Sequence, residues 1–78
     1  MSNPYLKHHI IEIVENQLND NNPPITTETY NRLIKAGYTS DIAKEKIATI
    51  VVEEIFDVLK HNSEYNEKRY TKKLKKLK

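Results

Sequence analysis

The chain has 78 residues, no cysteine, one glycine and a formal net charge of +2. This length suits one domain with a modest core, and without cysteine neither disulfide bonds nor thiolate metal sites can support the fold. No apolar run approaches the roughly 18 residues that a membrane span needs, so we expect a soluble, cytoplasmic protein with no membrane partner.

The composition favours helices over strands, because Glu, Lys, Ile and Leu are abundant and glycine is nearly absent. Hydrophobic periodicity and turn residues divide the chain into four segments. We therefore predict an all-α fold, a compact bundle around a central third helix, in a single domain over residues 1–78. The predicted helices span about 4–18, 23–36, 40–60 and 67–77.

The first helix is expected to start at Asn3 and Pro4, since Asn accepts hydrogen bonds from free amides and Pro tolerates the first helical position. Apolar residues then recur at three- and four-residue spacing, with Gln17 projected among them. This face is predicted to point inward and consists of Leu6, Ile10, Ile13, Val14 and Leu18.

The Asn, Asp and Pro residues at positions 19–24 predict a turn, with Asn22 as the N-cap of a helix that begins at Pro23 or Pro24. Gly37 suits the left-handed position that follows a helix C-terminus. The inward side chains of this second helix are predicted to be Ile25, Tyr30, Leu33 and Ile34.

The third helix can be capped by Thr39 or Ser40, with Asp41 favourably placed in its first turn. Its apolar residues cover roughly 240° of the helical wheel, far more than the stripe of a surface helix. The helix must therefore meet neighbours on several sides. Two interpretations stay open: the other three helices surround it, or part of the apolar arc forms a homodimer surface.

Glu54 projects into this apolar arc. A buried carboxylate is costly unless it is paired or hydrogen-bonded, and Gln17 is the expected partner. Such a contact would fix the register of the two helices. The alternative is that Glu54 is a functional acid.

The last predicted helix is strongly basic. Residues 65–78 hold seven of the thirteen basic residues and one of the eleven acids, a net charge of +6 that leaves −4 for the preceding residues. Asn66 is the expected N-cap, and Tyr65 and Tyr70 are placed for a hydrophobic staple. Tyr70, Leu74 and Leu77 share one face, so we expect the helix to dock on the bundle.

The cations of this helix allow two interpretations. They can contact phosphates or another anionic partner, or they can remain solvated and face acids of the protein's own body. The candidates for an anion or partner contact are Lys68, Arg69, Lys72, Lys73, Lys75 and Lys76.

No arrangement of residues indicates catalysis. A single glycine excludes a Gly-rich phosphate loop, and no serine lies in a glycine-flanked elbow. His8 and His9 point about 100° apart on a helix and cannot easily share a metal ion. The spacing of His8 and Glu12 suits an exposed pair instead. We expect no enzymatic activity, no cofactor and no metal site.

Short motifs make the chain resemble a family of small uncharacterised bacterial helical domains. The family pattern is N-P-x-x-H-x-x-x-H-x-x-x-E-x-Q, a P-P turn, and then G-x-D-x-H-E-A-x-H. The resemblance covers nearly the whole chain and implies a fold more than a function. It rests on Asn3-Pro4, Glu15-Asn16-Gln17, Asn22-Pro23-Pro24, Gly37-Tyr38 and Glu53-Glu54-Ile55.

Four histidines of the family pattern are replaced here by Lys7, Ile11, Asp41 and Glu45, whereas Glu15 fits the pattern. The resemblance implies a metal site in relatives, but isoleucine cannot bind a metal and protonated lysine repels one. We therefore expect Lys7 to pair with Asp41, Glu45 or Glu15, so that an ion pair replaces the metal.

These observations favour a structural or protein-interaction module without catalytic activity. Its partner would be another protein or a second copy of the chain, because the apolar arc of the third helix is so wide. The alternative is nucleic-acid binding through the basic last helix, in which phosphate contacts need no base-reading motif.

Overall fold

The computed structural model describes residues 4–62 and 64–78 and contains four helices in that part of the chain. They are α1 (Pro4–Asp20), α2 (Pro24–Lys35), α3 (Ser40–His61) and α4 (Glu67–Lys76). The predicted all-α fold is confirmed, and each boundary lies within two residues of its expected place. Asn3, the expected cap of the first helix, lies outside the described residues.

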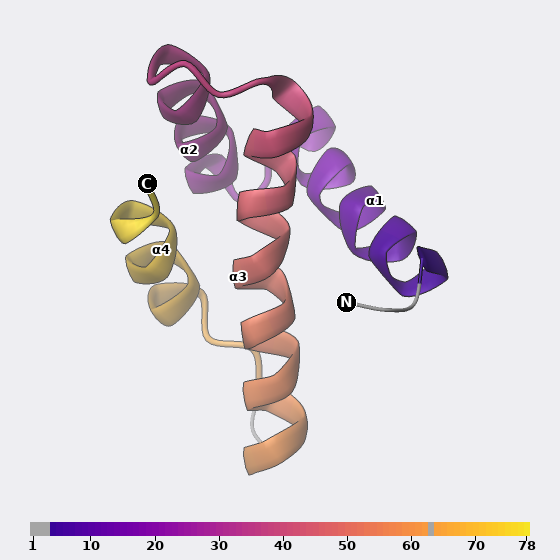
Figure 1. Cartoon of the computed structure of the whole chain (residues 1–78). Coiled ribbons are helices and arrows are strands. Elements are labelled where there is room, and N and C mark those ends of the chain that lie inside the picture. The colour runs from indigo at the N-terminus through magenta and orange to yellow at the C-terminus, as the bar shows by residue number, and fades with distance from the viewer. Residues whose placement is uncertain (1–3, 63) are drawn as a thin grey trace.

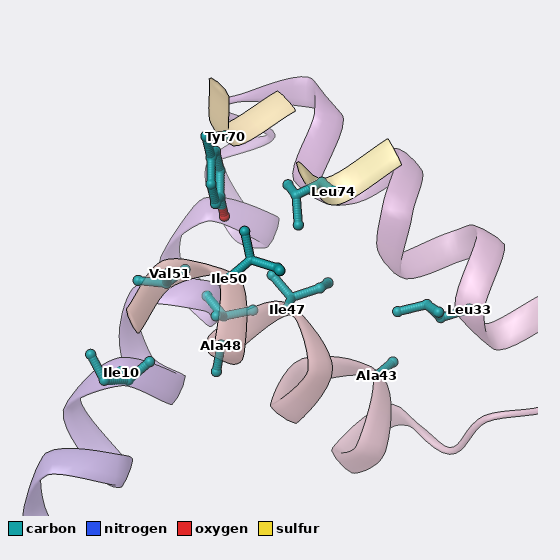
Figure 2. Close-up of a cluster of buried hydrophobic side chains, with 10 residues drawn as sticks. Ile10, Leu33, Ala43, Ile47, Ala48, Ile50, Val51, Tyr70 and Leu74 are labelled. Atoms are coloured by element: carbon teal, nitrogen blue, oxygen red, sulfur yellow. The ribbon is translucent and has the colours of Figure 1, made fainter. Parts of the chain in front are cut away.

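α3 is the central helix of the bundle and packs against α1, α2 and α4 (Figure 1). Its C-terminal end extends beyond the other three helices. The core forms around its first four turns (Figure 2). All four helices supply buried apolar side chains, namely Ile10, Val14, Leu33, Ala43, Ile47, Ala48, Ile50, Val51, Tyr70 and Leu74.

The inward face of α1 is narrower than predicted. Ile10 and Val14 are buried, and Leu18 is half-buried against them. Leu6 and Ile13, expected on the same face, keep 47% and 37% of their surface exposed. The prediction for these two residues was wrong because the neighbouring helices cover only the centre of the apolar stripe.

α2 begins differently from the prediction. Pro23 occupies the N-cap position without a side-chain cap, after a cis bond from Asn22, so the expected Asn22 cap was wrong. The Thr26 amide donates instead to the Pro23 carbonyl at 3.1 Å.

The buried face of α2 is also rotated from the expected one. Thr26, Thr29 and Leu33 are its buried residues, whereas Ile25 and Tyr30 are half-buried. Ile34, predicted to point inward, is 38% exposed. Hydrophobicity alone misplaced this face because Thr26 is buried through a hydrogen bond to α1, described below.

The end of α2 confirms the role predicted for Gly37. This residue has φ of +105°, a conformation that L side chains rarely adopt. The Gly37 amide donates to the Ile34 carbonyl at 3.0 Å and the Tyr38 amide to the Leu33 carbonyl at 3.2 Å. This is the Schellman pattern, which satisfies the free carbonyls at the helix end.

The caps of α3 and α4 also follow the sequence signals. The Thr39 hydroxyl accepts from the Ile42 amide, and the Asn66 side chain accepts from the Arg69 amide. The rings of Tyr65 and Tyr70 lie 5.9 Å apart, which confirms the predicted staple at the start of α4.

A contact that the sequence did not reveal closes the other end of α4. The guanidinium of Arg32, on α2, donates to the carbonyls of Leu74 and Leu77 at 2.8 and 2.6 Å. Arginine side chains near a helix C-terminus satisfy carbonyls that lack partners within the helix. α4 is thus held by side-chain hydrogen bonds at both ends.

Candidate interaction surfaces

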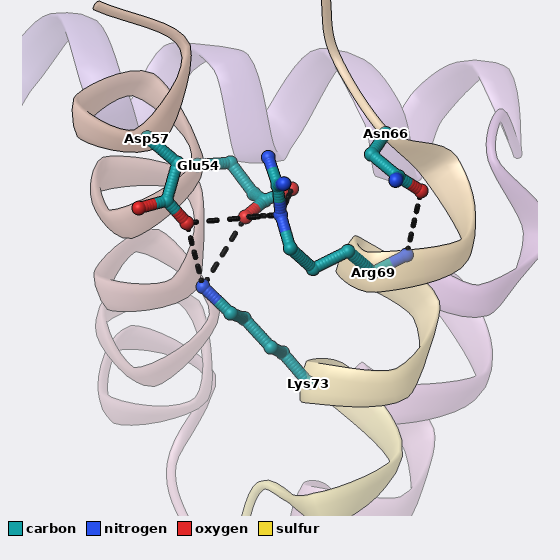
Figure 3. A network of polar contacts seen from close by, with 5 residues as sticks. All are labelled: Glu54, Asp57, Asn66, Arg69 and Lys73. Atoms are coloured by element: carbon teal, nitrogen blue, oxygen red, sulfur yellow. Dashed lines mark hydrogen bonds and ion pairs between the residues drawn. The ribbon is translucent and has the colours of Figure 1, made fainter. Parts of the chain in front are cut away.

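Glu54 is the centre of an ionic cluster that joins α3 to α4 (Figure 3). Its side chain is only 5% exposed, and its two oxygens accept from Arg69 Nε at 3.1 and 3.0 Å. Lys73 Nζ donates to Glu54 and to Asp57, both at 3.2 Å. The burial of Glu54 is therefore confirmed, but Gln17 as its partner was wrong. Two cations spaced four residues apart on α4 face these two acids directly.

The pKa values of Asp57, Arg69 and Lys73 shift in favour of their charged forms. The hydrogen bond from Lys73 lowers the pKa of the Asp57 carboxyl below its usual value. The hydrogen bond to Glu54 raises the pKa of the Arg69 guanidinium. Burial lowers the pKa of Lys73, but its hydrogen bonds to Glu54 and Asp57 outweigh that effect and leave it raised. Asp57, Arg69 and Lys73 are consequently charged at neutral pH.

Gln17 takes part in a different contact. Its side-chain oxygen accepts from the Thr26 hydroxyl at 2.7 Å and from the Tyr70 hydroxyl at 3.0 Å. Burial raises the pKa of the Tyr70 phenol, so its hydroxyl stays protonated and can donate. A single amide therefore links α1, α2 and α4 through two buried hydroxyl-bearing residues.

The structure divides the six cations that the sequence grouped as candidate anion contacts. Arg69 and Lys73 are partly buried, at 33% and 29% exposure, and are engaged by the body's own acids. The other four side chains are exposed, and no ion pair within the described residues includes them. They are Lys68, Lys72, Lys75 and Lys76.

Lys7 and Glu45 form an ion pair between α1 and α3, with 3.1 Å between the amine nitrogen and a carboxylate oxygen. Glu15 pairs instead with Lys44, at 3.0 Å, a partner that sequence reasoning missed. Both ion pairs and Asp41 line one open cleft between α1 and α3. No ion pair within residues 4–62 and 64–78 includes Asp41. Thus one of the three expected partners of Lys7 contacts it.

The described residues contain no group of three His, Asp or Glu side chains that could hold a metal ion. His9, rather than His8, lies near Glu12, with 3.9 Å between Nδ1 and the nearer carboxylate oxygen. The expected His8 pair was therefore wrong, although both spacings place side chains on one face of a helix.

An exposed apolar surface lies on one side of the C-terminal part of α3. Leu59 and Phe56 are 74% and 65% exposed, far more than any core residue. A neighbouring groove of about 300 Å³ lies between α1, α3 and the segment before α4. Partly exposed apolar side chains at its rim are Ile13, Ile55 and Tyr65. The packing of α3 by three helices is thus confirmed for its core-facing side, while Phe56 and Leu59 remain exposed.

No protein-family profile, curated protein or solved structure matches the chain. The family resemblance suggested by the short motifs therefore stays a prediction. Among the described helices, none has the length and apolar character to cross a membrane.

Proposed function

We propose that the protein is a small helical interaction module without catalytic activity, and that it docks another protein on the exposed end of α3. The observation that carries this proposal is the exposure of Phe56 and Leu59 beside an apolar groove. Large apolar side chains that gather at one surface of a small protein are typical of binding sites.

The rest of the bundle supports this assignment. The core is complete without Phe56 and Leu59, because Ile47, Tyr70 and Leu74 are almost fully buried elsewhere. The two exposed side chains thus contribute little to folding. Their apolar area is available for a partner.

A photo-crosslinking amino acid at position 56 tests the proposal in cells that make the protein. We expect a discrete adduct, which Leu59→Lys abolishes because a charge at that position must be desolvated on docking. The same crosslinker at Glu28, an exposed position of α2, is the matched control. An adduct equally strong at position 28, or unaffected by Leu59→Lys, would contradict the proposal.

Nucleic-acid binding is a second candidate function, supported by the exposed Lys68, Lys72, Lys75 and Lys76 on one helix. Spacings of three and four residues bring such lysines onto a shared face, where they can contact successive phosphates. Arg69 is excluded from this set because Glu54 engages it.

Salt dependence tests this second function. Binding of a single-stranded or duplex probe should weaken steeply with salt, and Lys72→Gln should reduce the logarithmic salt slope by about one. Lys35→Gln, which removes an exposed lysine of α2, should leave the slope unchanged. Equal effects of the two substitutions, or a flat salt response, would rule out the helix as the phosphate contact.

A further inference from the structure

We infer that the partner docked on the exposed end of α3 is a second copy of the chain, packed antiparallel through the same stretch of helix. This inference rests on the proposed docking function and names its occupant. The reasons are the spacing of the apolar residues, the charges beside them and the shape of the bundle.

Three apolar residues on the outer side of α3 form a narrow stripe that suits helix pairing. Val52, Phe56 and Leu59 follow one another at spacings of four and three residues, which is the pattern of a coiled-coil seam. Val52 is half-buried beside α1, while the other two side chains are largely exposed. A second helix laid along this stripe would cover Phe56 and Leu59.

The charges at the edge of the stripe decide the direction of the second helix. Glu53 and Lys60 follow Val52 and Leu59, two turns apart on one edge, and no ion pair within the described residues includes either. In antiparallel packing with Phe56 opposite Leu59 of the second copy, like edges meet and each Glu53 faces a Lys60. Two complementary charge pairs result.

A parallel pair lacks this match. It would bring the edge with Lys60 against the opposite edge of the second helix, where Ile55 lies. Both lysines would then lose their acidic partners. Charge complementarity therefore selects the antiparallel arrangement.

The shape of the bundle permits the antiparallel arrangement. The C-terminal end of α3 extends beyond α1, α2 and α4, so the bodies of two copies would lie at opposite ends of the paired helices (Figure 1). The contact spans only a few helical turns. We therefore expect it to bury less than ~1,200 Å², the lower end of the range for standard interfaces. We accordingly expect a dissociation constant in the micromolar range.

Charge exchange at the two edge positions tests the inference by sedimentation equilibrium. Glu53→Lys and Lys60→Glu should each weaken self-association about tenfold, because each places like charges opposite one another. An equimolar mixture of the two variants should restore the wild-type affinity, since the lysine introduced in one chain then faces the glutamate introduced in the other. Glu28→Lys and Lys35→Glu are controls with the same charge changes at exposed positions of α2.

The inference is overturned if the wild type stays monomeric at millimolar concentration, or if the mixture associates no better than its components. A monomer that still forms the Leu59-dependent adduct with a different protein removes the second copy as partner but preserves the docking surface. A monomer without that adduct contradicts both proposals.

Discussion

Glu54 is a buried carboxylate that two cations of α4 neutralise. Its side chain is nearly inaccessible, whereas Arg69 and Lys73 keep about a third of their surface in water. The acid Glu54 and its two cationic partners therefore differ in their access to water. Losing the carboxylate leaves cations that can turn toward solvent, but losing the cations leaves an acid that cannot.

This difference in exposure predicts that removing Glu54 destabilises the fold less than removing its two cationic partners. Glu54→Met should reduce the free energy of unfolding by about 1 kcal/mol, whereas the double variant Arg69→Met and Lys73→Met should reduce it by about 3 kcal/mol. Urea unfolding measures both values. Glu28→Met, at an exposed position of α2, is the control and should change little. An equal loss of unfolding free energy in Glu54→Met and in the double variant would contradict this account.

The protonation of Asp57 gives a second prediction at this scale. Its folded pKa lies below the ordinary value of 3.8, so the ionised form favours the folded state. This contribution is present above pH 3.8 and is lost as the pH falls through the lower folded value. A ¹³C titration of the carboxyl should show a midpoint below 3.8, and Lys73→Met should move it upward. A midpoint unchanged by that substitution would exclude Lys73 as the main cause.

At the scale of elements, the junction between α2 and α3 depends on one backbone conformation. Gly37→Ala should reduce the free energy of unfolding by about 1 kcal/mol because of its positive φ. A Cβ at this position would meet no atom within 4 Å, so the cost comes from the backbone alone. Gly37→Asn should cost less, since Asn tolerates left-handed conformations better. Chemical denaturation would contradict this account if alanine were neutral or asparagine the costlier residue.

The elements themselves could be predicted from the sequence because their signals are local. The cap at Asn66, the staple of Tyr65 and Tyr70, and the glycine at the end of α2 each act within a few residues. Such signals are readable without knowing the packing. The four helices and their ends follow from them.

Contacts between elements were harder to predict because several residues could satisfy the same need. Glu54 required a partner, and both an amide on α1 and cations on α4 qualified; the four-residue spacing of Arg69 and Lys73 decided the outcome. Gln17 instead accepts a hydrogen bond from Thr26, a buried residue of α2. Sequence reasoning pointed to the wide apolar arc of α3 but could not tell which part stays uncovered.

At the scale of the whole molecule, the basic last helix closes the bundle. Tyr70 and Leu74 are almost fully buried, and α4 carries both cations of the ionic cluster. Removing residues 67–78 should therefore abolish the cooperative thermal transition. Replacing Lys68, Lys72, Lys75 and Lys76 by Gln should leave the melting temperature nearly unchanged, because these side chains are solvated. A truncated chain that melts like the wild type would exclude this structural role of α4.

The central claim is that the projecting end of α3 is a docking surface that a second copy occupies. An isotope-filtered NOE experiment on a mixture of labelled and unlabelled chains tests it most directly. The predicted result is a set of intermolecular NOEs between the Phe56 ring of one chain and the Leu59 methyl groups of the other. A dimer whose intermolecular NOEs arise elsewhere, or a filtered spectrum without any such signal at millimolar concentration, would contradict the claim.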